Sequence, residues 1–129
     1  MTNKRPLNIL IAASEAAPLA KAGGLGDVVG SLPLVLRDLG CRVAVVLPAY
    51  RQALEQAGDL KMTAEGLPVR LGKSELTADI LMGKLAPGVP LCLVRRDEFF
   101  DRDELYGSSH GEYVDNRGRV IFFSRLFPS

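Results

Sequence analysis

The sequence predicts an α/β fold with a Rossmann-like parallel sheet, because it opens with a strand, a glycine-rich loop, a helix and a second strand. Residues 7–13 and 42–47 are almost continuous aliphatic runs, too short for helices and typical of strands buried on both faces. Between them, residues 27–39 carry apolar side chains at helical spacing. Such a βαβ unit places its two strands side by side and parallel, joined by a right-handed crossover.

The predicted helix over residues 27–39 has a clear end and an ambiguous beginning. Gly40 follows it directly and suits the conformation in which many helices terminate. Pro33 lies inside the segment, where its ring clashes with the carbonyl of Val29 and it offers no N–H. Either the helix is kinked at Pro33 or its regular part starts near Ser31, and the sequence leaves both open. The apolar positions that define the helical spacing are Val28, Leu32, Val35, Leu36 and Leu39.

The second half of the chain carries weaker signals. Polar and apolar residues alternate over residues 76–82, which predicts a half-exposed strand, and the apolar run over residues 89–94 predicts another buried one. Residues 101–111 are charged and contain glycine, which indicates a surface loop, whereas residues 115–127 open like a helix. No internal repeat or low-complexity linker interrupts the sequence, so we expect residues 1–129 to form one domain, itself incomplete.

Composition narrows the classes of function. The 129 residues are 47% hydrophobic and 24% charged, within the range of a single globular domain. The 16 basic and 15 acidic residues leave a net charge of +1, which argues against nucleic acid and against an anionic membrane as partners. No apolar stretch reaches the roughly 18 residues of a membrane-spanning helix. The apolar run after Arg5 leads into Glu15 and Lys21 rather than into a signal-peptide cleavage site.

The cysteines and the single histidine offer little for a metal site. Cys41 and Cys92 lie far apart, each beside a strand-like run, so we expect two reduced, buried thiols and a cytoplasmic location. His110 stands alone in a polar loop and is expected to be exposed. Residues 95–98 indicate a mixed-charge turn, and the phenylalanine pairs at 99–100 and 122–123 are expected in the core or at a contact between domains. No metal and no cofactor is predicted.

Gly23, Gly24 and Gly26 lie where the first predicted strand passes into the predicted helix. At such a place the free N–H groups and the positive end of the helix dipole favour an anion, and a diphosphate would fit. The spacing matches neither the G-x-G-x-x-G dinucleotide motif nor a P-loop. The glycines alone are equally compatible with a tight turn. Lys21 favours the first interpretation, because a cation just ahead of the glycines would complete a phosphate-binding corner.

Three short segments, taken in order, form a more specific pattern. The first contains Ser14, Glu15 and Pro18 and then the run from Lys21 to Val28, which reads K-A-G-G-L-G-D-V. The second is L-P-A-Y over residues 47–50, directly after the second predicted strand. The third comprises Tyr106, Tyr113, Asp115, Asn116 and Arg119. Together they closely resemble the ADP-glucose-dependent glycogen and starch synthases, with their K-[TA]-G-G-L-x-D-V, L-P-x-[YF] and Y…Y-x-D-N-x-x-R motifs. Val120 departs from the phenylalanine usual after the arginine.

The resemblance implies a two-domain GT-B glycosyltransferase that transfers glucose from ADP-glucose to the non-reducing end of an α-1,4-glucan, with retention. This chain would be part of the N-terminal, acceptor-side domain, and the donor-binding C-terminal domain is absent from it. By resemblance Lys21 contacts the diphosphate, Gly23 and Gly24 let the backbone approach the donor, and Asp27 lines the same corner. Glu15 and Tyr106 are implied on the acceptor side. Fixed cations lower the barrier as negative charge grows on the departing diphosphate. No catalytic residue is assigned.

Two other functions remain compatible with the sequence. One is a non-catalytic module that keeps a nucleotide- or glucan-binding βαβ unit without the chemistry. The other is a related GT-B glycosyltransferase with another sugar-nucleotide donor, since the missing domain sets most of the donor selectivity in the family. In either case the 129-residue chain by itself is expected to transfer no glucose, because the facing donor domain is needed to orient the reactants.

Overall fold

The computed structural model describes residues 6–102, 104–108, 111–113 and 115–125. In chain order the elements are β1 (Asn8–Ala12), α1 (Gly24–Asp38), β2 (Arg42–Pro48), α2 (Arg51–Gln56), β3 (Lys61–Leu71), β4 (Ser74–Ala86), β5 (Val89–Arg95), α3 (Asp97–Phe100), β6 (Gly107–Ser108), β7 (Gly111–Glu112) and α4 (Asn116–Ser124). Five of the strands form one sheet in the order β1-β2-β5-β4-β3, and β6 and β7 form a small separate ribbon.

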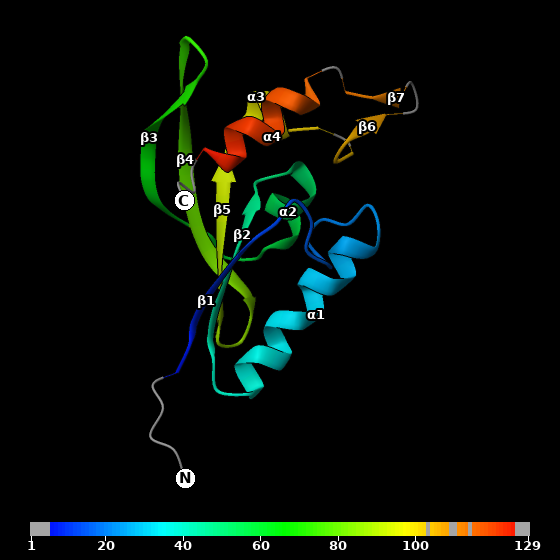
Figure 1. The fold of residues 1–129 in the computed structure, drawn as a ribbon, viewed down its shortest axis with the longest axis vertical. Coiled ribbons are helices and arrows are strands. Elements are labelled where there is room, and N and C mark those ends of the chain that lie inside the picture. The colour runs from blue at the N-terminus through cyan, green and yellow to red at the C-terminus, as the bar shows by residue number, and fades with distance from the viewer. Residues whose placement is uncertain (1–5, 103, 109–110, 114, 126–129) are drawn as a thin grey trace.

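The first half of the sheet is the predicted βαβ unit. β1 pairs with β2 in parallel, with Ile9 opposite Val43, and β2 pairs with β5 in parallel, with Val46 opposite Cys92. Helix α1 lies along β2 and connects it to β1 (Figure 1). The predicted α/β class and the parallel pairing of the first two strands are therefore confirmed.

The second half of the sheet is antiparallel, so the sheet is mixed rather than wholly parallel. β4 pairs antiparallel with β5, with Ile80 opposite Val94, and β3 pairs antiparallel with β4. The connection from β4 to β5 is two residues long and turns at Gly88, whose φ is +78°. A connection this short cannot cross over the sheet, so the two strands must run in opposite directions. The half-exposed strand predicted over residues 76–82 is part of β4, and β3 was not predicted.

Helix α1 begins earlier than predicted and runs through its proline. It starts at Gly24 rather than at residue 27, and Pro33 is buried inside a continuous helix. The predicted end is confirmed. Gly40 adopts a φ of +94°, its N–H donates to the carbonyl of Arg37, and the N–H of Cys41 donates to the carbonyl of Leu36. Such a left-handed residue satisfies the last helical carbonyls and stops the helix.

The core lies between the central strands and the aromatic residues near the end of β5. Val45, Leu47, Leu91 and Leu93 are fully buried on β2 and β5. As predicted, Phe99, Phe100 and Phe122 are buried in the core and stack edge to face or tilted on one another, whereas Phe123 is only partly buried against it. The charged turn predicted over residues 95–98 is instead the junction of two elements, because Arg95 ends β5 and Asp97 begins α3.

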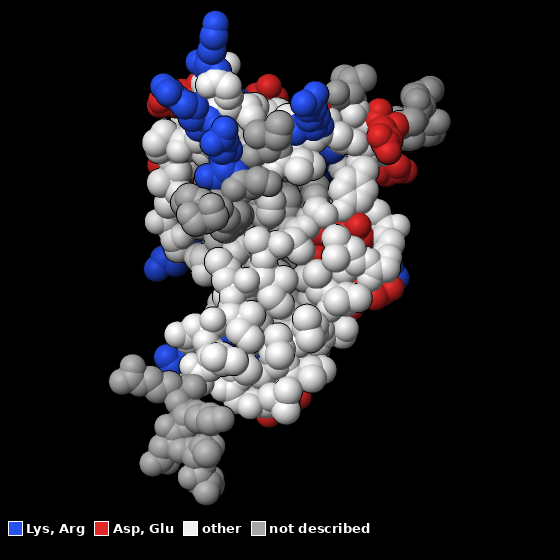
Figure 2. Space-filling model, in the orientation of Figure 1, with Lys and Arg blue, Asp and Glu red and all other residues white. Residues whose placement is uncertain are grey.

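The sequence predicted that the first strand is buried on both faces, and this prediction is wrong. β1 is an edge strand, and the side chain of Leu10 is 58% exposed. Helix α1 likewise exposes an apolar stripe whose members lie three or four residues apart, Leu25, Val28, Leu32, Val35 and Leu39. Figure 2 shows the surface over β1 and α1 with few charged side chains, whereas Lys and Arg gather at the opposite end. Within the described residues no element covers this surface.

The remaining sequence expectations concern the thiols, the last helix and the histidine. Cys41 and Cys92 are free thiols, and both are half-buried rather than buried. The predicted helix over residues 115–127 is confirmed as α4, although residues 126–127 lie outside the described residues. His110 also lies outside them. Among the helices of the described part of the chain, none is long and apolar enough to cross a membrane.

Candidate functional site

The loop between β1 and α1 is fixed by backbone pairing and by buried small residues. Ala16 and Ala20 exchange N–H and carbonyl groups at 2.8 and 3.0 Å, and both are fully buried. Ala17 donates its N–H to the carbonyl of Gly26, which joins the loop to the first turn of α1. A Cβ at Gly30 would lie 2.5 Å from the carbonyl oxygen of Ala17, so only glycine lets the helix approach the loop this closely. The residues carried by the loop are therefore held by the core.

Glu15 is a buried carboxylate at the start of α1. Its side chain is 5% exposed, and its Oε1 accepts the backbone N–H groups of Ala22 at 2.8 Å and Gly23 at 2.9 Å. Burial by itself raises the pKa of Glu15, but the hydrogen bonds from Ala22, Gly23 and Tyr106 outweigh burial and leave the pKa below its usual value. Glu15 is thus an ionised internal anion where the sequence predicts an anion-binding helix terminus.

Tyr106 joins this corner from the far end of the chain. Its hydroxyl donates to Oε2 of Glu15 at 2.8 Å, although the two residues are 91 positions apart, and it lies 2.7 Å from the hydroxyl of Ser14. Burial raises the pKa of the Tyr106 phenol, and the neighbouring Glu15 carboxylate raises it further, so the phenol stays protonated. Both oxygens of Glu15 are therefore bonded to protein donors.

Lys21 and Asp27 form an ion pair at the mouth of the corner. Nζ of Lys21 lies 2.9 Å from Oδ1 of Asp27, and the two side chains are 50% and 60% exposed. A Cβ at Gly26 would lie 3.0 Å from Cγ of Lys21 and 3.2 Å from Oε1 of Glu15, so the glycine makes room for both side chains. Because an exposed pair of this kind contributes only about 0–1 kcal/mol, Lys21 can exchange Asp27 for another anion at little cost.

Gly23 and Gly24 have no structural reason to be glycine within the described chain. A Cβ built on either residue meets no atom within 4 Å, and neither residue has a positive φ. Gly23 caps the start of α1 and Gly24 is its first residue, so both lie close to Lys21 in the sequence. The absence of a side chain at these two positions keeps the surface next to the cation open to a close approach from outside.

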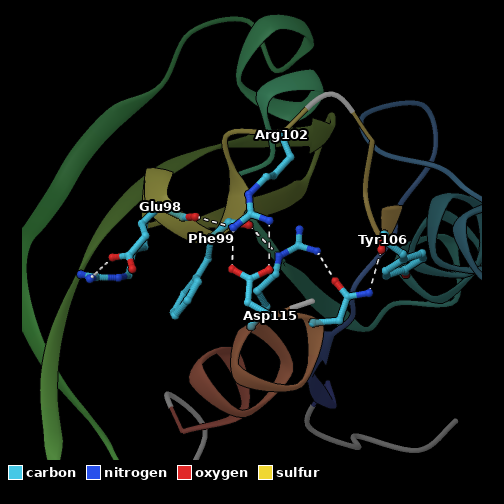
Figure 3. Close-up of polar contacts among 8 residues, drawn as sticks. Glu98, Phe99, Arg102, Tyr106 and Asp115 are labelled. Atoms are coloured by element: carbon cyan, nitrogen blue, oxygen red, sulfur yellow. Dashed lines mark hydrogen bonds and ion pairs between the residues drawn. The ribbon is translucent and has the colours of Figure 1, made fainter. Parts of the chain in front are cut away.

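The third motif of the sequence is a connected polar cluster around the start of α4. Arg102 donates to both carboxylate oxygens of Asp115, at 3.0 and 2.6 Å, and Figure 3 shows the two side chains facing each other. This contact holds the pKa of Asp115 below its usual value. Asn116 donates from Nδ2 to the carbonyl of Tyr106 at 2.7 Å and accepts from Nη1 of Arg119 at 2.6 Å. Nε of Arg119 donates to the carbonyl of Phe99 at 2.6 Å.

A cavity of about 370 Å³ lies between this cluster and the ends of β1 and β2. Its walls include aromatic rings and a few polar groups, namely Ser14, Tyr50, Phe100, Tyr106, Asn116 and Arg119. Arg119 is 4% exposed, and in the part of the chain that the structure describes its Nη2 has no hydrogen-bond partner. Apolar walls with a few polar groups are typical of small-molecule sites.

The structure brings all six predicted site residues to one corner. Lys21, Gly23, Gly24, Asp27 and Glu15 share the loop and the first turn of α1, and Tyr106 reaches them through Glu15. Sequence reasoning did not single out Tyr50, Asn116 and Arg119 as site residues, although each lay within a recognised motif. Within the described residues, no group of His, Cys, Asp and Glu side chains could hold a metal ion.

The fold and this corner define an α/β domain whose βαβ unit carries a lysine and two open glycines at a helix start. Residues 8–127 match the family described as the starch synthase catalytic domain. The chain therefore belongs to the starch synthase catalytic domain family.

Individual relatives agree with this assignment. The glycogen synthase of Syntrophotalea carbinolica is 44% identical over 119 residues, which cover 92% of this chain and 24% of the relative. The glycogen synthase of Moorella thermoacetica is 42% identical over 127 residues, covering 97% of this chain and 24% of the relative. The catalytic domain of Starch Synthase IV from Arabidopsis thaliana, bound to ADP and acarbose, is 29% identical with a TM-score of 0.78, covering 95% of this chain and 24% of that chain. The chain thus spans about a quarter of the length of these proteins.

Proposed function

We propose that this chain is part of the N-terminal, acceptor-side domain of a glycogen synthase. The longer protein that contains it, called the parent protein below, transfers glucose from ADP-glucose to the non-reducing end of an α-1,4-glucan with retention. The observation that carries the proposal is the corner in which Lys21 lies beside two glycines that neither packing nor backbone conformation requires. The likeness to a starch synthase domain bound to ADP and acarbose supports it.

Lys21 is the proposed contact to the donor diphosphate. Its side chain is half exposed and is paired with an exposed carboxylate, so a diphosphate, with more negative charge than Asp27, can displace that partner. As the glycosidic bond to the donor breaks, negative charge grows on the leaving diphosphate, and a fixed cation stabilises that transition state. Asp27 lines the same corner and receives Lys21 again when the product leaves.

Gly23 and Gly24 are the proposed point of close approach between backbone and donor. The N–H of Gly23 is occupied by Glu15, so the contribution of Gly23 is the space that a side chain would otherwise fill. The later amides of the first turn of α1 contribute the positive end of the helix dipole. A diphosphate beside Lys21 would fit the space left by the glycines and be stabilised by the helix dipole, without any change in the fold.

The acceptor glucan is proposed to lie on the Tyr106 side of the corner. Tyr106 lines this cavity together with Tyr50 and Phe100, and sugar rings pack their C–H faces against aromatic surfaces. The oxygens of Glu15 are bonded to protein groups, so any contribution of Glu15 to acceptor binding is indirect. The remaining partner in this proposal is the donor-binding domain of the same parent protein, and the location is the cytoplasm.

Incorporation of labelled glucose into glycogen by the purified parent protein tests the function. ADP-glucose is expected to support transfer far better than UDP-glucose, and the new linkages are expected to be α-1,4. Transfer from UDP-glucose alone would assign the protein to another donor. No transfer from any sugar nucleotide, with binding of ADP or glycogen retained, would make it a non-catalytic binding module.

A further inference from the structure

Two backbone N–H groups directly ahead of α1 are already bonded to a side chain of the protein. Glu15 accepts the N–H groups of Ala22 and Gly23, the two residues that directly follow Lys21. The position of the Lys21 backbone therefore depends on the position of the Glu15 carboxylate. An incoming diphosphate cannot use these two amides, so its charge stabilisation depends more heavily on where Lys21 stands.

The Glu15 carboxylate is in turn held by the third motif. The hydroxyl of Tyr106 donates to Oε2 of Glu15, and the carbonyl of Tyr106 accepts from Nδ2 of Asn116 and from the N–H of Tyr113. Asn116 is fixed by Arg119, which is buried and anchored on the carbonyl of Phe99. A continuous set of hydrogen bonds thus leads from α3 and α4 to the loop that carries Lys21.

We infer that Tyr106 is a positioning residue for the donor-binding loop: its hydroxyl orients Glu15, and Glu15 orients Lys21 through the amides of Ala22 and Gly23. This inference rests on the proposed function, since the loop is taken to bind ADP-glucose. Under this inference the side chain of Tyr106 has two roles. Tyr106 lines the proposed acceptor cavity, and its hydroxyl acts on the donor side through Glu15.

Tyr106→Phe in the parent protein removes the hydroxyl and keeps the ring. Because the hydroxyl acts on the donor only indirectly, through Glu15, we expect kcat/KM for ADP-glucose to fall by about three- to tenfold, less than for the loss of a direct charge-assisted contact. The KM for glycogen is expected to stay at the wild-type value, because the ring is unchanged. The matched control is Tyr113→Phe, on the same segment, whose hydroxyl accepts the N–H of Glu104 at 3.3 Å. The control is expected to leave both substrates unaffected.

A double substitution tests whether Tyr106 acts through Lys21. If it does, Tyr106→Phe combined with Lys21→Ala lowers kcat/KM for ADP-glucose no further than Lys21→Ala alone. If the two effects multiply, Tyr106 does not act through Lys21 and the inference is overturned. A rise in the KM for glycogen with an unchanged KM for ADP-glucose would also overturn it, because the hydroxyl would then be an acceptor contact.

Hydrogen–deuterium exchange provides a readout that does not depend on activity. The amides of Ala22 and Gly23 are protected by Glu15, so a peptide covering residues 20–26 is expected to exchange faster in Tyr106→Phe and at the wild-type rate in Tyr113→Phe. Unchanged exchange in Tyr106→Phe would refute the positioning role. If exchange changes as expected but the wild-type parent protein transfers no glucose, the positioning role holds and the proposed function fails.

Discussion

Replacing Lys21 by alanine in the parent protein is predicted to impair donor binding without unfolding the domain. The side chain of Lys21 is half exposed and pairs with the exposed Asp27, so its removal opens no core cavity. We therefore expect the free energy of unfolding to change by no more than roughly 0.5 kcal/mol. A charge-assisted phosphate contact contributes about 1.5–3 kcal/mol, which corresponds to a fall of about ten- to a hundredfold in kcat/KM for ADP-glucose.

Steady-state kinetics at saturating glycogen, with thermal melts in parallel, measure this prediction. Lys21→Arg is expected to recover part of the activity, because its charge is kept while the planar guanidinium differs in shape from a compact ammonium. Lys73→Ala is the control, since Lys73 is an exposed lysine at the turn between β3 and β4, away from the corner. It is expected to match the wild type in both measurements.

Two results would refute the reasoning about Lys21. If Lys21→Ala keeps the wild-type kcat/KM for ADP-glucose, the lysine does not contact the donor. If its loss of activity is matched by an equally large drop in melting temperature, the corner is a structural turn. In either case the open space at the neighbouring glycines would need another explanation.

Three further predictions concern neighbouring parts of the structure. Gly24→Ala is expected to have the melting temperature of the wild type, because a Cβ at this position meets no atom within 4 Å. It is also expected to raise the KM for ADP-glucose, and an unchanged KM would show that Gly24 is not part of the donor site. Asp115→Asn is expected to destabilise the protein by about 1 kcal/mol at neutral pH. Since the folded pKa of Asp115 lies below 3.8, the difference in melting temperature from the wild type should shrink as pH falls through and below that value; a constant difference down to pH 2 would contradict it. Leu93→Ala, at a fully buried position of β5, is expected to cost about 2–5 kcal/mol, seen as a large drop in melting temperature.

Local signals in the sequence were sufficient for the βαβ unit and for most of the corner. Two aliphatic runs separated by a helical pattern allow few arrangements other than parallel neighbours, which β1 and β2 are. Gly40 marked the end of α1 because a left-handed residue is needed there. Lys21, Gly23, Gly24 and Asp27 come together because they lie within seven consecutive residues at one strand-to-helix junction.

Burial and strand direction depended on the tertiary structure. The sequence of β1 is as apolar as that of a central strand, but β1 lies at an edge, and within the described residues nothing covers its outer face or the apolar stripe of α1. Apolar composition shows that a surface can be buried and does not show what covers it. The antiparallel half of the sheet follows from two-residue turns at Gly72 and Gly88, whose effect on strand direction the alternation of residues does not reveal.

The link between Tyr106 and Glu15 was also decided only in three dimensions. The sequence assigned both residues to the same side of the site through a resemblance, without indicating that they touch. A hydrogen bond between side chains 91 residues apart depends on the path of the whole chain between them. That path is set by the sheet, by the phenylalanine cluster and by the anchoring of Arg119 on Phe99, none of which has a local signature in either residue. The sequence by itself thus determined which chemical groups are available at the corner, and the tertiary structure determined which of them are already bonded to one another.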